Sequence, residues 1–230
     1  MKRTKQTEQY NANTIALLKK RIAFHEAGHA VAIHEAGKHH DLPAVFFQIT
    51  FNVTPQDKLS DRHINYSGSD TYSAQIIGGR LIENLPVSLD AYINKLESEP
   101  EQQIKQQNIK RFLANFETDI LNFLIGPLAE AKYIAQYDDE LFNSHLININ
   151  TLNYFGGASD IAMINEYLTC FSSCKNKQEE KLAELLIQAF DFVNNETHWE
   201  KIQRLAFYID DKDEKSISFD DISRVVNESN

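Results

Sequence analysis

Two histidines stand four residues apart in a short stretch with the pattern H-E-x-x-H, formed by His25, Glu26 and His29. If this stretch is an α-helix, four residues advance by about 400°, so the two imidazoles lie about 40° apart and one turn above the other. This spacing allows both histidines to bind one zinc ion. Glu26 lies about 100° from His25 around the helix. It can therefore flank the metal without binding it, where a general base that activates water belongs.

The residues around this motif follow helical spacing, and the two histidines share a stripe with apolar residues: Ile15, Leu18, Ile22, His25, His29 and Ile33. The pattern predicts an amphipathic helix whose N-cap is Asn13 or Thr14. Ligands on a buried stripe are held rigidly, which favours a metal site. Gly28 costs this helix about 1 kcal/mol relative to alanine. We therefore expect another segment to approach the helix closely at Gly28.

A partial copy of the motif follows at His34 and Glu35, but it lacks a second histidine. His34 is nine residues past His25, so it points about 180° away on a regular helix. We interpret it as a surface histidine that takes no part in the site. Gly37 and the polar residues after it are expected to end the helix, with His39 and His40 solvated.

Composition excludes several classes of protein. The 230 residues suit one domain, residues 1–230, and an apolar content of 42% predicts a folded globule. A net charge of −10 argues against nucleic-acid binding. No apolar run approaches the roughly 20 residues that span a bilayer, and the basic N-terminus lacks the apolar core of a signal peptide. We therefore expect no membrane span and a cytosolic protein.

Cysteine usage supports this expectation, because Cys170 and Cys174 are too few for a disulfide framework. We interpret both as free thiols that are partly buried. Metal binding or a redox pair by these two residues are the alternatives.

One segment of the chain predicts a strand, residues 45–53, which are rich in β-branched and aromatic residues. Residues 66–71 read as a turn or loop that joins a second short strand. From about residue 73 onward, the sequence mixes apolar and polar residues without a clear pattern. We interpret the segment at about residues 80–110 as a polar helical insertion.

The second half of the chain is dominated by helical spacing. Helices are expected at residues 112–131, with a bend or break at Gly126 and Pro127, and at residues 161–171, 182–193, 196–209 and 218–226. The last helix is expected to be capped by Ser218 or Asp220. Asp160 stands at a helix start after a glycine-containing loop, where an N-cap is the simplest role for it. The predicted fold is one mainly helical domain with a small sheet or hairpin.

Three motifs resemble the peptidase domain of the FtsH-type ATP-dependent zinc proteases. Residues 23–32 (AFHEAGHAVA) are similar to the zinc-binding helix of that family, and residues 124–130 (LIGPLAE) resemble its Leu-Gly-Gly-Arg-x-Ala-Glu helix. Residues 157–160 (GASD) resemble the family segment that ends in Asn-Asp, whose aspartate is the third zinc ligand. The resemblance implies a helical zinc-peptidase fold in which His25, His29 and Asp160 bind zinc. Glu26 is then the catalytic base.

The chain also departs from this family. It contains no G-x-x-x-x-G-K-[S/T] phosphate loop, no transmembrane segment and no Gly-Met-Ser after the Asp160 helix, and Pro127 replaces the arginine of the second motif. We therefore expect peptidase activity that does not depend on ATP, with an ATPase acting in trans as a candidate partner. A homo-oligomer stays an open alternative. Glu130 is the rival third ligand, but we expect it to accept the free N–H of a ligating histidine.

These observations favour a zinc metalloendopeptidase that hydrolyses unfolded polypeptides, with residues 46–53 pairing with the substrate as an edge strand. One alternative is a noncatalytic zinc-stabilised domain that regulates or docks on an ATPase. Another alternative is a helical interaction module without a metal. The presence of Glu26 favours the enzyme, because a structural zinc site has no need of a general base.

Overall fold

Seven α-helices and a small antiparallel sheet form the part of the chain that the structure, a computed structural model, describes: residues 12–38, 42, 45–55, 64–66, 70–98, 101–212 and 215–228. The elements in order are α1 (Ala12–Ala36), β1 (Phe47–Pro55), β2 (Ile64–Tyr66), β3 (Asp70–Gly78), α2 (Leu89–Lys95), α3 (Gln102–Tyr137), α4 (Ala158–Phe171), α5 (Lys175–Asn194), α6 (Glu196–Asp210), β4 (Ser216–Ile217) and α7 (Phe219–Asn227), with short 3-10 turns at Leu96–Ser98 and Thr151–Phe155. The prediction of a mainly helical fold with a small sheet is confirmed. The predicted solvated pair His39 and His40 lies outside the described residues.

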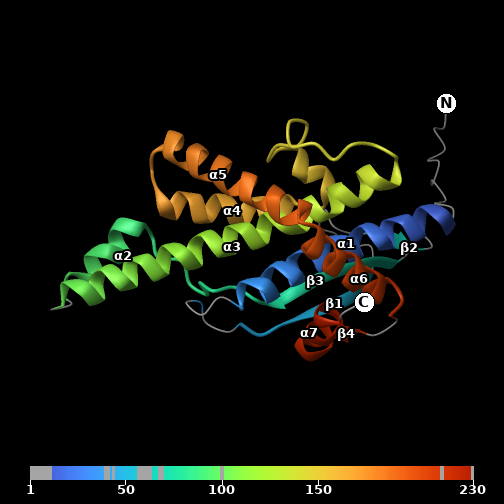
Figure 1. Cartoon of the computed structure of the whole chain (residues 1–230), viewed down its shortest axis with the longest axis horizontal. Coiled ribbons are helices and arrows are strands. Elements are labelled where there is room, and N and C mark those ends of the chain that lie inside the picture. The colour runs from blue at the N-terminus through green and yellow to red at the C-terminus, as the bar shows by residue number, and fades with distance from the viewer. Residues whose placement is uncertain are drawn as a thin grey trace.

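Helix α3 is the longest element and runs along the middle of the molecule, with α4 and α5 on one side and α1 on the other (Figure 1). Its 36 residues span about 54 Å. Gly126 and Pro127 do not break it, contrary to the expected interruption. Both residues are buried between neighbouring elements. Tertiary packing thus outweighs the hydrogen bond that Pro127 cannot donate.

Helix α1 packs between α3 and α6, and its second half is almost wholly buried. Gly28 lies at the contact with α3. A Cβ added there would lie 2.8 Å from the Ala129 Cβ and 2.9 Å from the Ile125 carbonyl oxygen. The predicted close approach at Gly28 is confirmed, because only glycine lets the two backbones come this near.

His34 is buried, so the prediction of a surface histidine is wrong. His34 points away from His25, as its offset of nine residues predicts for a regular helix. However, α7 covers this side of α1. The Nε2 of His34 lies 3.4 Å from the Asn227 side-chain nitrogen at the end of α7, and its Nδ1 lies 3.4 Å from Glu35. A helix that is packed on two sides buries residues that a single amphipathic stripe would leave exposed.

The sheet has the strand order β2-β3-β1-β4, and all neighbours are antiparallel. Strand β1 confirms the predicted strand, but it is not an edge. It pairs with β3 from Phe47↔Gly78 to Pro55↔Asp70, and on its other side Ile49 and Thr50 pair with β4. Residues 46–53 are therefore not the free edge that the sequence predicts, because β4 occupies this side of β1 at Ile49 and Thr50.

Strand β3 provides the edge instead. Strand β2 pairs only with Asp70, Thr71 and Tyr72 of β3. Within the described residues, positions 73–78 of β3 have no strand partner on the side away from β1. Most of β3 falls in the stretch that the sequence left without a clear pattern.

The remaining helices agree with the sequence pattern, and the predicted cap of α7 is confirmed, since the Ser218 hydroxyl accepts a hydrogen bond from the Asp221 N–H. Near the start of α3, α2 packs against it through stacked rings of Tyr92 and Phe112, 4.3 Å apart.

Both cysteines are free thiols, and burial raises the pKa of Cys170. Among the described residues, no helix is both long and apolar enough to cross a membrane.

Candidate metal centre

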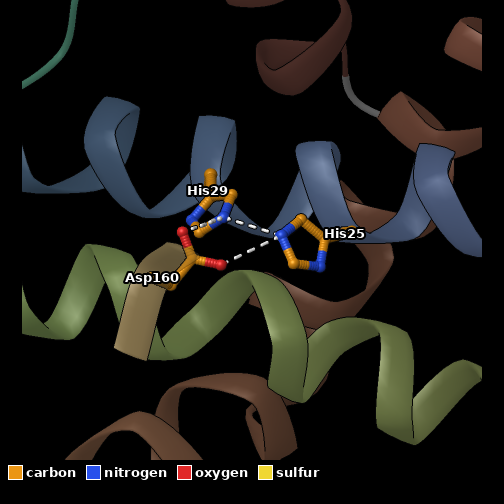
Figure 2. Close-up of side chains that lie close together, drawn as sticks. All are labelled: His25, His29 and Asp160. Carbon is orange, nitrogen blue, oxygen red and sulfur yellow. Dashed lines mark hydrogen bonds and ion pairs between the residues drawn. The ribbon is translucent and has the colours of Figure 1, made fainter. Parts of the chain in front are cut away.

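The side chains of His25, His29 and Asp160 point at one another in the interior of the protein (Figure 2). The two histidines come from consecutive turns of α1, and Asp160 comes from the first turn of α4. The Nε2 atoms of His25 and His29 lie 3.1 Å apart. The Asp160 carboxylate oxygens lie 3.3 Å from Nε2 of His25 and 3.6 Å from Nε2 of His29.

These distances fit a single metal ion. Two ligand atoms that each lie about 2.0–2.1 Å from zinc in a tetrahedral arrangement are roughly 3.3–3.4 Å apart. The three separations, 3.1, 3.3 and 3.6 Å, lie near that value, with the last two measured to different oxygens of Asp160. Two imidazole nitrogens and one carboxylate oxygen are also a donor set of catalytic zinc sites, which leave a fourth position for water or substrate.

Each histidine is oriented by its other ring nitrogen. The Nδ1 of His29 lies 2.6 Å from the Asn122 carbonyl oxygen. The Nδ1 of His25 lies 3.1 Å from the Phe155 carbonyl oxygen and 3.2 Å from Oε2 of Glu130. Since carbonyl and carboxylate oxygens only accept, the proton of each neutral ring belongs on Nδ1. This tautomer leaves both Nε2 lone pairs facing the cluster, as metal binding requires.

Glu130 therefore lies beside His25 and not among the three converging ligand atoms. Its carboxylate accepts from Nδ1, on the side of the ring away from Asp160. This is the contact that the sequence predicts for Glu130, as an acceptor for a ligating histidine.

Asp160 reaches the cluster because of a tight turn before α4. Gly156 has a φ of +69°, which favours glycine, and Gly157 caps the helix, so Asp160 is not the N-cap. Burial alone raises the pKa of the Asp160 carboxyl. When both rings are protonated, the charge of His29 and hydrogen bonds from both histidines outweigh this effect and hold the pKa well below its ordinary value. The neutral rings that bind a metal leave this part to the charge of the ion. The carboxylate is therefore ionised at neutral pH.

Glu26 is buried and lines a cavity of about 190 Å³ beside the cluster. His29 and Asp160 line the same cavity, together with residues of α1, β3, the following loop and α3: Ile33, Ile76, Gly79, Arg80, Asn122 and Phe123. The carboxyl group of Glu26 thus belongs to the space next to the three donors without being one of them. A molecule that entered this cavity would lie beside Glu26, His29 and Asp160 together.

Two supporting residues were not singled out from the sequence. Arg21 donates from Nε to Oε1 of Glu130 at 2.8 Å, and its place one turn before His25 on the same helix face was the available signal. Asp119 accepts hydrogen bonds from the backbone N–H groups of Leu81 and Ile82 at 2.8 and 2.9 Å and from the Tyr167 hydroxyl at 2.8 Å. These bonds hold the loop after β3 to α3. Burial raises the pKa of the Asp119 carboxyl above its ordinary value. No sequence pattern indicates this role.

The fold and the site together define a mainly helical protein with a buried cluster of two histidines and one aspartate that can hold a metal ion. Comparisons of the chain with protein-family models, curated proteins and solved structures found no match. A closer assignment depends on the motifs and on the geometry of the site.

Proposed function

We propose that this chain is a zinc metalloendopeptidase of the FtsH-peptidase type, which hydrolyses peptide bonds in unfolded polypeptides. The observation that carries the proposal is the position of Glu26 in a cavity that also contains His29 and Asp160. The contact with His25 explains the burial of Glu130, whereas Glu26 lies at the cavity, where hydrolysis requires a base.

The residues divide the work as follows. His25, His29 and Asp160 hold the zinc ion, which when bound polarises the substrate carbonyl and lowers the pKa of water. Glu26 takes a proton from the attacking water and passes it to the leaving amine. Asn122 and Glu130 keep the two imidazoles in the tautomer that binds metal.

The edge of β3 supports a polypeptide as the substrate. Residues 73–78 have no strand partner on that side within the described residues, and Gln75, Ile76 and Gly78 line the cavity that contains Glu26. An extended peptide can add to such an edge through backbone hydrogen bonds. Its scissile bond would then lie near the metal centre. An unfolded segment can adopt this extended form.

Substitution of Glu26 by glutamine tests the proposal. Gln has the same shape but cannot take a proton, and loss of a general base costs about 10²–10⁴-fold in rate. We expect Glu26→Gln to keep about one zinc per chain by metal analysis and to cleave casein at least ~100-fold more slowly. Glu35→Gln is the matched control. Glu35 lies on the same helix and directly follows His34, as Glu26 follows His25, but it lies outside the cavity. This variant should cleave at the wild-type rate.

Equal cleavage by the wild type and Glu26→Gln, with zinc verified in both, would refute this assignment. If neither protein cleaves while both bind zinc, the noncatalytic zinc-stabilised domain that regulates an ATPase becomes the better description. Activity should not change when ATP is added, because the sequence contains no phosphate loop.

A further inference from the structure

Arg21 lies one turn before His25 on α1 and donates two hydrogen bonds from the same guanidinium group. Its Nε donates to Oε1 of Glu130 at 2.8 Å, and an Nη donates to the Tyr154 carbonyl oxygen at 3.0 Å. The other oxygen of Glu130 lies 3.2 Å from Nδ1 of His25. Arg21 therefore contacts both the acid beside His25 and the segment that leads to Asp160.

We propose that Arg21 is a positioning residue for the metal centre, which fixes Glu130 against His25 and holds the segment before Asp160 against α1. This inference rests on the proposed function, since it assigns Arg21 to the same zinc site. It goes beyond that function, because it identifies the Arg21 guanidinium as the group that joins α1 to the segment before α4. These two helices supply the proposed ligands.

The segment at residues 154–156 packs directly on the histidine side of the site. The Phe155 carbonyl oxygen lies 3.1 Å from Nδ1 of His25. A Cβ at Gly156 would lie 3.0 Å from Oε2 of Glu130 and 3.2 Å from Nδ1 of His25. Asp160 follows this segment within one turn of α4. A shift of the segment would therefore move Asp160 relative to the His25 ring.

The guanidinium group is suited to this task because its N–H donors lie in one rigid plane. One donor can be used on a carboxylate while its neighbour is used on a carbonyl, so the two acceptors are held at a fixed separation. Glu130 is nearly enclosed, with 6% of its side chain exposed, whereas Arg21 is 28% exposed. A buried carboxylate needs a charged partner, and Arg21 supplies it from the surface side without entering the metal site.

The test is the zinc affinity of Arg21→Met, measured by competition with a chromophoric chelator. Loss of an outer partner of a metal ligand typically weakens metal binding by about 10–100-fold, and we expect a loss in this range. Lys181→Met is the matched control. Lys181 likewise joins an acid of α3, Glu117, to another helix at 2.9 Å and is partly buried, but it lies outside the site. It should bind zinc as the wild type does.

Two further measurements separate positioning from a general structural effect. The visible absorption spectrum of the Co²⁺-substituted protein should change in Arg21→Met and not in Lys181→Met. Arg21→Lys keeps the charge but cannot present two coplanar donors, so its zinc affinity should fall between those of the wild type and Arg21→Met.

The outcomes are distinguishable. Zinc binding by Arg21→Met within twofold of the wild type would overturn the inference and leave the proposed function standing. An equal loss in Lys181→Met would also overturn it, since the effect would then be global. An affinity of Arg21→Lys equal to the wild type would refute the role of the planar donors. A wild-type chain that binds no zinc would refute the proposed function and this inference together.

Discussion

Gly126 of α3 lies directly against the His29 ring. A Cβ added at Gly126 would lie 2.2 Å from Nε2 of His29, 2.4 Å from Cε1 and 2.6 Å from Cδ2. Carbon atoms do not approach a ring this closely, so the ring occupies the space that a side chain would need. The absence of a side chain at Gly126 is therefore a condition for the position of a ligand.

Substitution of Gly126 by alanine should displace His29 and weaken the metal centre. We expect zinc affinity to fall by at least ~10-fold and the free energy of unfolding to fall by about 1–3 kcal/mol from overpacking. Zinc competition and urea unfolding measure the two effects. Gly37→Ala is the control, because a Cβ at Gly37 would meet its nearest atoms at 3.5 and 3.6 Å, which is ordinary contact. Wild-type zinc affinity in Gly126→Ala would show that the ring relaxes at no cost to the site.

The residues of the site differ in how far the sequence could predict them. The spacing of His25, Glu26 and His29 is a local property of one helix, so a periodicity argument could predict that they share a face. Asp160 has no such signal and was reached only through the resemblance to a family motif. Arg21 was not predicted, because its role depends on Glu130, which the packing of α1 against α3 brings to it.

At the scale of elements, Glu35 joins α1 to α6. Its carboxylate accepts hydrogen bonds from Lys201 of α6 at 2.8 Å and from Lys38 at 2.9 Å, and His34 lies 3.4 Å away. Burial raises the pKa of Glu35, but these three partners outweigh it and hold the pKa well below the ordinary value of 4.5. A group whose pKa falls on folding stabilises the folded state above its unfolded pKa, and this contribution is lost as the pH decreases.

Glu35→Gln should therefore change the pH dependence of stability. We expect the variant to be about 1–2 kcal/mol less stable than the wild type at pH 7, and the difference to shrink as the pH falls below about 4.5. Urea unfolding at a series of pH values measures this. Glu184→Gln is a suitable comparison, since Glu184 forms an exposed ion pair with Lys181 that contributes little. A constant difference between wild type and Glu35→Gln at all pH values would contradict the explanation.

Helices were easier to predict than the sheet for a physical reason. The amphipathic spacing of α5 and α6 and the serine cap of α7 are local, and each appears in the structure near its predicted position. The position of β1 inside the sheet depends on β4, which is far away in the sequence and only two residues long. The burial of His34 by α7 is equally non-local. These features depend on contacts that no window of sequence contains.

At the scale of the whole molecule, a metal ion in the cluster would join α1 to α4, two helices that are far apart in the sequence. The unfolded chain holds no such arrangement of donors, so metal binding would favour the folded state. The three candidate ligand residues are all buried, and they can move apart only if α4 leaves α1. The metal would therefore act on the cooperative stability of the molecule as well as on the proposed catalysis.

Zinc should raise the unfolding temperature of the purified protein after metal has been removed with a chelator. At a free zinc concentration about 100 times the dissociation constant, binding stabilises the folded state by about 2.7 kcal/mol. For a chain of this size, that corresponds to an increase of about 5–11 °C, measured by scanning calorimetry. Asp160→Ala should lose most of this increase, because two histidines alone underligate the ion. Glu26→Gln should keep it, because Glu26 is not one of the three ligand residues.

If Glu130→Ala abolishes the increase while Asp160→Ala retains it, the roles of the two acids are reversed. An equal increase in the wild type and in a variant lacking both His25 and His29 would place the zinc elsewhere in the protein.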